Sequence, residues 1–150
     1  MNKIVEMEFF SENVAKIVLK APDIANSRKA GHFVIIRLDE KGERIPLTIA
    51  DGDPAKGTIT LVVQKVGVTS AKLLAKKIGD EILDVVGPLG HDTHIENYGT
   101  VLCAGGGVGV APMMPIVKAL KEAGNKVITV LAGRTKELII MEEEMRKYSD

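Results

Sequence analysis

The sequence has a single cysteine, Cys103, no tryptophan, and only three phenylalanines and two tyrosines. One cysteine excludes an internal disulfide and any four-cysteine zinc or iron–sulfur site built from this chain alone, and we expect no metal site. The few aromatic side chains argue against a platform that stacks single-stranded nucleic acid. No apolar run approaches the length that spans a bilayer, and the first residues lack the hydrophobic core and cleavage site of a signal peptide. We therefore expect no membrane partner and a cytoplasmic location.

An excess of either charge is also absent, because 20 lysines and arginines balance 20 aspartates and glutamates. A neutral chain gives no electrostatic reason to expect nucleic acid as a partner. The 150 residues, 45% hydrophobic and 27% charged, are typical of a globular protein with one ordinary domain or two small ones. Cys103 ends an apolar segment with no base nearby in sequence, which favours a buried structural thiol over a reactive one.

Residues 1–95 consist of short β-type segments separated by turns. Alternating apolar and polar residues, β-branched runs and Gly, Pro and Asp turn signals indicate where strands begin and end. The expected strands are residues 5–9, 15–20, 31–38, 45–50, 58–66 and 82–86. This series predicts a six-stranded antiparallel β-barrel. One helix interrupts it, with Thr69 or Ser70 as the expected N-cap and Gly79 as the expected end.

From Thr100 onward the pattern alternates between strand and helix. The expected elements are a strand over 100–104, a helix over 111–123, a strand over 127–132 and a helix over 136–148. This order predicts the first half of a doubly wound parallel sheet. We place a barrel domain at residues 1–95 and a partial α/β lobe at residues 96–150. Two parallel strands cannot form a well-covered sheet, so we expect this lobe to be incomplete, either truncated or completed by a partner chain.

The most informative segment of the second lobe is residues 105–112. Three consecutive glycines follow an apolar strand, and Ala111-Pro112 begins a helix. Bare backbone at a helix N-terminus suits a phosphate-bearing cofactor, whereas the alternative is a tight turn without a ligand. The dinucleotide fingerprint GxGxxG is not matched, because Val110 stands where its last glycine would be. Gly133-Arg134 follows the second strand at the ligand-binding end of such sheets, where the alternative is a solvated arginine.

Two further motifs lie in the barrel. Arg44-Ile45-Pro46-Leu47-Thr48 combines five guanidinium donors suited to a phosphate with a hydroxyl that can hydrogen-bond a flavin ring nitrogen. An edge strand with a surface arginine is the alternative. Gly67-Val68-Thr69-Ser70 precedes the short helix, where free N–H groups suit a pyrophosphate. An ordinary turn with a capping hydroxyl is the alternative there.

The order of these motifs resembles the ferredoxin–NADP reductase superfamily, in which a flavin-binding barrel precedes a nicotinamide-binding lobe. The resemblance covers the whole chain and rests on residues 31–34, 44–49, 87–90 and 105–112. Within the superfamily, the likeness is to the small FAD- and NAD-binding subunits of sulfide dehydrogenase or NADH-dependent ferredoxin:NADP oxidoreductase. The electron-transfer subunit of dihydroorotate dehydrogenase is related to them. Arg44 departs from the common pattern, because it lies four residues before Thr48 instead of three.

The resemblance implies an electron-transfer flavoprotein subunit with FAD as cofactor and NAD(P)H as substrate. Thr48 would be the catalytic residue beside the isoalloxazine ring. The implied FAD-binding residues are Arg44, Ile45, Pro46, Leu47 and Thr48, with Gly67, Val68, Thr69 and Ser70 at the pyrophosphate. The implied nicotinamide-dinucleotide-binding residues are Gly105, Gly106, Gly107, Val108, Gly109, Val110, Ala111, Pro112, Gly133 and Arg134.

The resemblance also implies a heteromer with a larger iron–sulfur or flavin oxidoreductase subunit that receives single electrons. Relatives of full length carry a [2Fe–2S] cluster on a cysteine-rich segment, which this chain lacks. The alternative is a non-catalytic or truncated flavin-binding assembly module without NAD(P)H oxidation. The sequence does not distinguish NADH from NADPH, and it does not indicate the final electron acceptor.

Overall fold

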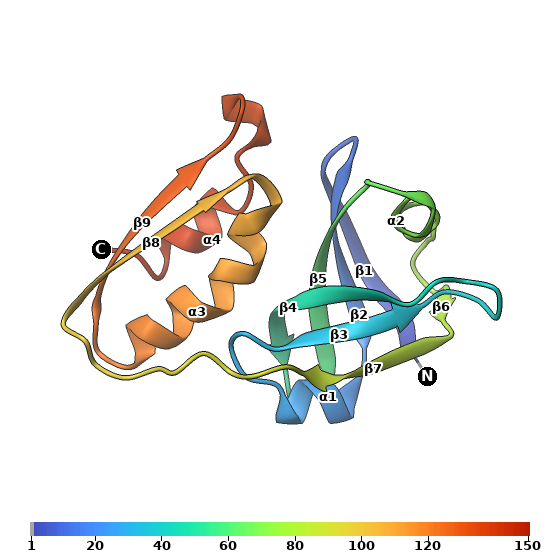
Figure 1. Cartoon of the computed structure of the whole chain (residues 1–150), viewed down its shortest axis with the longest axis horizontal. Coiled ribbons are helices and arrows are strands. Elements are labelled where there is room, and N and C mark those ends of the chain that lie inside the picture. The colour runs from blue at the N-terminus through green and yellow to red at the C-terminus, as the bar shows by residue number, and fades with distance from the viewer. Residues whose placement is uncertain (1) are drawn as a thin grey trace.

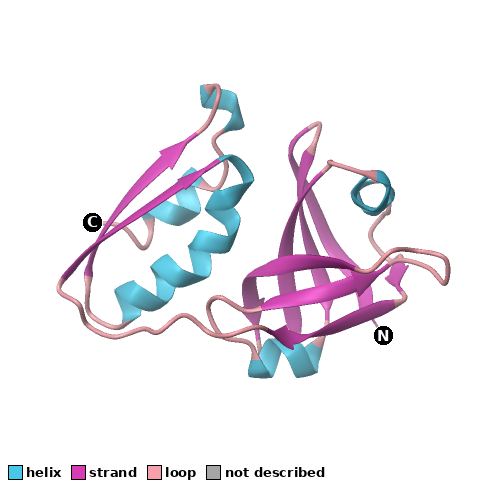
Figure 2. Ribbon diagram, viewed as in Figure 1, coloured by secondary structure: helices cyan, strands magenta, loops and turns pink. Residues whose placement is uncertain are grey.

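The computed structural model describes residues 2–150, which form two lobes lying side by side (Figure 1). The first lobe is a β-barrel over residues 2–89, and the second is a small α/β unit over residues 100–150. An extended segment without helix or strand, residues 90–99, joins them (Figure 2). The fold class predicted from the sequence, a barrel followed by a partial parallel α/β lobe, is confirmed.

Seven antiparallel strands form the barrel. They are β1 (Asn2–Ser11), β2 (Val14–Lys20), β3 (Phe33–Arg37), β4 (Ile45–Asp53), β5 (Thr58–Gln64), β6 (Glu81–Ile82) and β7 (Asp84–Leu89), in the sheet order β6-β1-β2-β5-β4-β3-β7. The count differs from the predicted six because the segment 82–86 is divided at Leu83 into β6 and β7. β6 pairs with β1 and β7 pairs with β3, so the bend at Leu83 brings the two edges of the sheet together and nearly closes the barrel.

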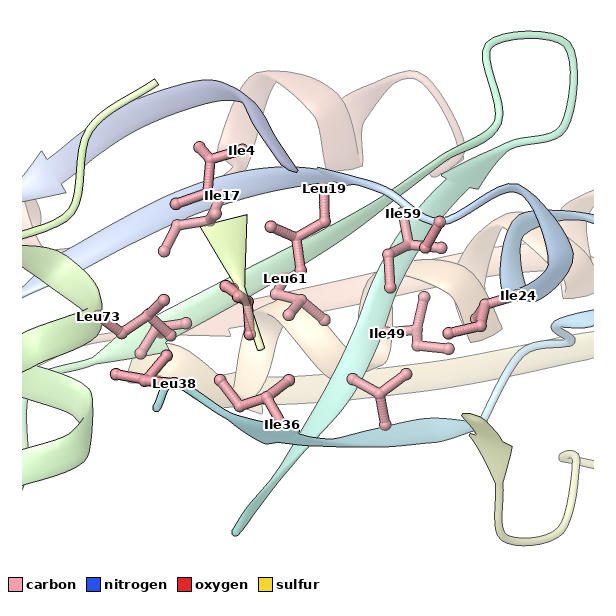
Figure 3. Close-up of a cluster of buried hydrophobic side chains, with 14 of the residues drawn as sticks. Ile4, Ile17, Leu19, Ile24, Ile36, Leu38, Ile49, Ile59, Leu61 and Leu73 are labelled. Atoms are coloured by element: carbon pink, nitrogen blue, oxygen red, sulfur yellow. The ribbon is translucent and has the colours of Figure 1, made fainter. Parts of the chain in front are cut away.

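The barrel core is aliphatic, because alternate residues of each strand point inward. Figure 3 shows this cluster, whose fully buried members include Ile4, Ile17, Leu19, Ile36, Ile49, Ile59, Leu61 and Leu73. Burial of each such side chain contributes about 1.5–3 kcal/mol to folding. In β4 the inward residues are Ile45, Leu47 and Ile49, so the residues between them lie on the outer face of the barrel.

Helix α1 (Pro22–Ser27) is absent from the sequence prediction. Proline at the first helical position is preorganised for a helix, and Asp23 lies in the first turn, where negative charge is favourable. Ile24 and Ala25 are buried in the barrel core. The helix therefore covers one end of the barrel (Figure 1).

Helix α2 (Val68–Leu74) lies where a helix was predicted, but both of its ends differ from the prediction. Its N-cap is Gly67 instead of Thr69 or Ser70. The Ser70 hydroxyl acts from the third helical position, where it accepts the N–H of Gly67 at 3.0 Å. The helix ends before Gly79, which has a φ of +95° and lies in the following turn.

The second lobe has a two-stranded parallel sheet with helices packed on one face. Its elements are β8 (Thr100–Gly106), the 3-10 turn η1 (Gly107–Gly109), α3 (Val110–Glu122), β9 (Lys126–Ala132), the 3-10 turn η2 (Lys136–Leu138) and α4 (Glu142–Arg146). The single helix predicted over 136–148 is therefore wrong. Ile140 is buried in the core of the lobe, and Met141 beside it has a left-handed φ of 59°. Drawing Ile140 inward interrupts the helix between η2 and α4.

The two lobes share an apolar interface. Ala50 of β4 and Val62 of β5 are buried in the same cluster as Val110 and Met114 of α3. An ion pair crosses the interface beside this cluster, with Lys118 Nζ 3.8 Å from Asp51 Oδ1. Helix α3 is therefore the element that fixes the second lobe to the barrel.

Candidate functional site

The outer face of β4 supplies the barrel side of the site. Because strand residues alternate, Pro46 and Thr48 lie on the face opposite to Ile45 and Leu47, which pack against the barrel core. Ala50, the next residue on the outer face, is buried under α3. Thr48 is half-buried, so its hydroxyl lies on the barrel surface just beside the interface between the lobes.

The glycine-rich segment forms the end of β8, the turn η1 and the first turn of α3, which confirms its predicted strand-to-helix geometry. Its glycines have different roles. A Cβ on Gly105 would lie 3.1 Å from Met113 Cε, so this glycine allows β8 to pack closely on α3. A Cβ on Gly107 or Gly109 would meet nothing within 4 Å, and Gly107 has a φ of +56° that favours glycine. The turn therefore exposes bare backbone at the N-terminus of α3.

These two segments face each other across a groove of about 290 Å³. The barrel contributes Pro46, Leu47, Thr48, Val62, Gln64 and Val66, and the second lobe contributes Val108, Gly109, Ala111 and Pro112. The structure thus brings the residues around Thr48 together with the glycine-rich turn. The sequence pattern does not indicate that Val62 and Gln64 of β5, and Val66 after it, line the groove. Their alternation along 58–66 is visible in the sequence, but their place beside β4 depends on the β4–β5 pairing.

The predicted pyrophosphate segment lies next to Val66, at the start of α2, and does not line the groove. The Ser70 hydroxyl accepts the N–H of Val66 at 2.9 Å and donates to the Gly67 carbonyl at 3.1 Å. Thr69 and Ser70 are buried, whereas a Cβ on Gly67 would meet open space. The hydroxyl of Ser70 therefore has a capping role, and phosphate binding by residues 67–70 stays a prediction.

Arg44 lies just before β4, outside the lining of the groove. Its Nη1 donates to Asp84 Oδ2 at 3.1 Å, and Nε of Arg37 donates to the same oxygen at 2.8 Å. Burial raises the pKa of Asp84, but the hydrogen bonds from the two guanidinium groups outweigh this effect and hold the pKa below its usual value. Asp84 is therefore ionised at neutral pH, and its contribution to stability is lost only as the pH falls through the lowered pKa.

Gly133 and Arg134 follow β9 and are exposed, and neither lines the groove. A Cβ on Gly133 would lie 3.1 Å from the carbonyl oxygen of Thr135, so this glycine serves a tight turn. In the same turn, the backbone N–H of Glu137 and the Thr135 hydroxyl stabilise the Glu137 carboxylate and lower its pKa. The part of Gly133 and Arg134 in ligand binding stays a prediction.

Cys103 is half-buried against the core of the second lobe, and burial raises the pKa of its thiol. Because the thiolate is the reactive form, a raised pKa favours a structural role. We expect the native protein to react with Ellman's reagent at pH 7 several-fold more slowly than the protein unfolded in urea. A Cys103→Ala variant gives the background, and equal rates for the native and unfolded protein would contradict this interpretation.

Residues 2–150 contain neither a metal-ligating cluster nor a membrane-spanning helix. No group of three or more His, Cys, Asp or Glu side chains in this range is arranged to hold a metal ion. No helix in the same range is long and apolar enough to cross a membrane. His94 instead pairs with Glu96 in the segment between the lobes, with 3.0 Å between Nε2 and Oε2.

The nearly closed antiparallel barrel followed by a small parallel α/β lobe matches solved structures of ferredoxin reductase-like proteins. The structure of phthalate dioxygenase reductase, described as modular for electron transfer from pyridine nucleotides to [2Fe-2S], matches with a TM-score of 0.80. The match covers 99% of this chain and 50% of that one at 17% identity, so it concerns the fold alone. The predicted superfamily fold is confirmed.

Relatives with higher sequence identity indicate which proteins of this fold the chain is most similar to. The whole chain is 52% identical, over 150 residues, to 53% of the dihydroorotate dehydrogenase B (NAD(+)) electron transfer subunit homolog of Thermotoga maritima. It is 31% identical over 153 residues to the electron transfer subunit of Bacillus mycoides, covering 98% of this chain and 59% of that protein. A chain of NADH-dependent reduced ferredoxin-NADP oxidoreductase matches with a TM-score of 0.96 and 52% identity, covering 100% of this chain and 54% of that one. No family model matches the chain.

The chain is therefore a homologue of electron-transfer subunits of flavin-based oxidoreductases, and its fold is that of the ferredoxin–NADP reductase superfamily. The resemblance predicted from the sequence is confirmed. The chain spans about half the length of the curated relatives it matches.

Proposed function

We propose that this chain binds FAD on the barrel, receives reducing equivalents from NAD(P)H and passes them to a partner subunit. The observation that carries the proposal is the groove in which Thr48 and Pro46 of the barrel face Val108 and Gly109 of the second lobe. Ligands held on opposite walls of one groove lie within reach of each other, and such positioning is a large part of catalysis.

The barrel side of the groove fits a flavin ring. Complete ligand sites have volumes of about 300–1,000 Å³, so a groove of about 290 Å³ suits one ring system better than a whole dinucleotide. Pro46 and Val66 supply exposed apolar surface, and Thr48 supplies a hydroxyl that orients the ring. Arg44 is suited to hold a phosphate through its remaining guanidinium donors. FAD, when bound, supplies the redox chemistry, and the protein supplies position and electrostatics.

The opposite side of the groove suits a nicotinamide dinucleotide. Helix α3 has 13 residues, and its N-terminal N–H groups and positive dipole end attract phosphate groups. Gly107 and Gly109 leave room for close approach to this backbone. Gly133 and Arg134 follow the carboxyl end of β9, the edge at which parallel sheets bind ligands.

The proposed partner is supported by the uncovered face of the β8–β9 sheet. Leu102, Ile128 and Val130 on this face are 67%, 42% and 49% exposed. Parallel strands are normally buried on both faces, and we propose that a further polypeptide segment covers this one. A larger iron–sulfur or flavin oxidoreductase subunit fits that role. The location of the protein in the cytoplasm stays a prediction. The same face supports the second candidate function, a non-catalytic assembly module.

Titration of the purified protein with FAD, followed by reduction with NADH or NADPH, tests the proposal. We expect a stoichiometric flavin complex that is reduced slowly. Replacing Thr48 with valine should slow reduction about five- to tenfold, the value of one hydrogen bond, whereas Thr48→Ser should restore the rate. Thr60→Val is the matched control, because Thr60 does not line the groove. A flavin-free obligate oligomer would favour the assembly module, and wild-type kinetics in Thr48→Val would contradict the role of the hydroxyl.

A further inference from the structure

One carboxylate oxygen in the barrel is shared by two arginines from different segments. Asp84 at the start of β7 lies directly opposite Arg37 of β3 in the antiparallel pairing. Oδ2 of Asp84 accepts Nε of Arg37 at 2.8 Å and Nη1 of Arg44 at 3.1 Å. The side chains of Arg37, Asp84 and Arg44 are 26%, 31% and 53% exposed. The first two therefore form a half-buried cross-strand pair, and Arg44 attaches to it from the surface.

The hydrogen bond to Asp84 restricts the position of the Arg44 side chain, which the backbone around Arg44 does not. Arg44 precedes the first residue of β4, so no strand pairing holds its backbone. The contact with Asp84 ties its guanidinium to two paired strands, β3 and β7. An arginine has five N–H donors, and Nη1 is the only guanidinium nitrogen of Arg44 that contacts Asp84. The two arginines and one aspartate carry a net charge of +1 (2 − 1), which favours an anion at the free side of Arg44.

We propose that Asp84 is a positioning residue that holds the Arg44 guanidinium in place for a flavin phosphate, and that Arg37 anchors Asp84. This inference rests on the proposed flavin site. A long side chain that is already fixed loses less conformational entropy when a ligand binds. Asp84 therefore acts on the phosphate-dependent part of flavin affinity and leaves the ring contacts at Thr48 unchanged.

Three flavins that differ in phosphate content test the inference. The dissociation constants of FAD, FMN and riboflavin are measured by fluorescence titration of the 150-residue protein. Asp84→Asn should weaken FAD and FMN about three- to tenfold and leave riboflavin, which has no phosphate, within about twofold. Arg37→Gln removes the anchor of Asp84, so it should also weaken FAD and FMN and leave riboflavin nearly unchanged. Adding Asp84→Asn to Arg44→Gln should cause no further loss.

Asp53→Asn at the far end of β4 is the matched control, because it removes the same charge away from Arg44. Tighter binding of FAD by Asp84→Asn would show that Asp84 competes with the phosphate, and would overturn the inference. Equal weakening of riboflavin, or no change for any flavin, would overturn it as well. If the wild-type protein binds none of the three flavins, the proposed flavin site fails, and the inference fails with it.

Discussion

Replacing Asn125 with alanine should lower the free energy of unfolding by about 2 kcal/mol. The Asn125 side chain is buried in the turn between α3 and β9, and it makes one hydrogen bond to α3 and two to the segment that joins the lobes. Its Oδ1 accepts the N–H of Tyr98 at 2.6 Å, and its Nδ2 donates to the carbonyls of Glu96 at 2.9 Å and Leu120 at 2.8 Å. Alanine removes the partners of the Tyr98 N–H and the Glu96 carbonyl, whereas the Leu120 carbonyl keeps the backbone N–H of residue 125 at 3.2 Å. Each group left without a partner costs about 1–3 kcal/mol, with the lower value expected where water can reach it.

Urea unfolding of the two proteins measures this effect. Asn125→Asp offers a sharper variant, because a carboxylate keeps the acceptor for Tyr98 but directs its second oxygen at two carbonyl oxygens. We expect it to be at least as unstable as Asn125→Ala at pH 7 and to recover in part at low pH, where the protonated acid can donate. Asn13→Ala in the exposed β1–β2 turn is the control and should change stability by less than about 0.5 kcal/mol. A loss below about 1 kcal/mol for Asn125→Ala would contradict the assigned role.

Replacing Gly109 with leucine should slow the reduction of bound FAD by NADH or NADPH about a hundredfold, because displacement of a reactant by about 1 Å has an effect of that size. Gly109 lines the groove opposite Thr48, and a Cβ there meets nothing within 4 Å. Its φ of −62° and ψ of −15° are helical, so leucine introduces no backbone strain. The added side chain should therefore act on the nicotinamide side of the groove without destabilising the fold.

Stopped-flow reduction at saturating FAD measures the effect, with thermal unfolding as a check on the fold. Ala75→Leu is the matched control, since Ala75 is exposed at the end of α2 and does not line the groove. Unchanged reduction in Gly109→Leu would show that the glycine-rich turn does not approach the nicotinamide. If Gly109→Leu instead unfolds at a clearly lower temperature than the wild-type protein, the slower reduction follows from a damaged fold, and the glycine has a structural role.

The sequence predicted the architecture wherever local periodicity agreed with tertiary packing. The strands of the barrel and the β8–α3–β9 unit have strong alternation or helical spacing, and both are present. The errors fall where burial of single residues overrides local preference. Ile140 is drawn into the core and divides a predicted helix. The bend at Leu83 divides a predicted strand, because its two halves pair with opposite edges of the sheet.

For the candidate site as well, the sequence predicts some features, and others depend on contacts between distant segments. Motif order brought Thr48 and the glycine-rich turn into one hypothesis, and the structure places both at one groove. The pairing of Arg37 with Asp84 could not be predicted, because residues 47 positions apart meet only through the β3–β7 register. The packing role of Gly105 is equally invisible in sequence, since it depends on the approach of Met113 from the next helix.

Strand β4 of the barrel both lines the groove and packs against helix α3 of the second lobe. Thr48 and Ala50 are two residues apart on its outer face, the first in the groove and the second beneath α3. Strands rise about 3.3 Å per residue, so the distance from the hydroxyl to the helix that positions the glycine turn is set by a single stiff segment. A rotation of the second lobe about its contact with Ala50 would displace groups near that contact less than groups far from it. On the proposed function, the two ring systems would therefore meet close to the contact that joins the lobes.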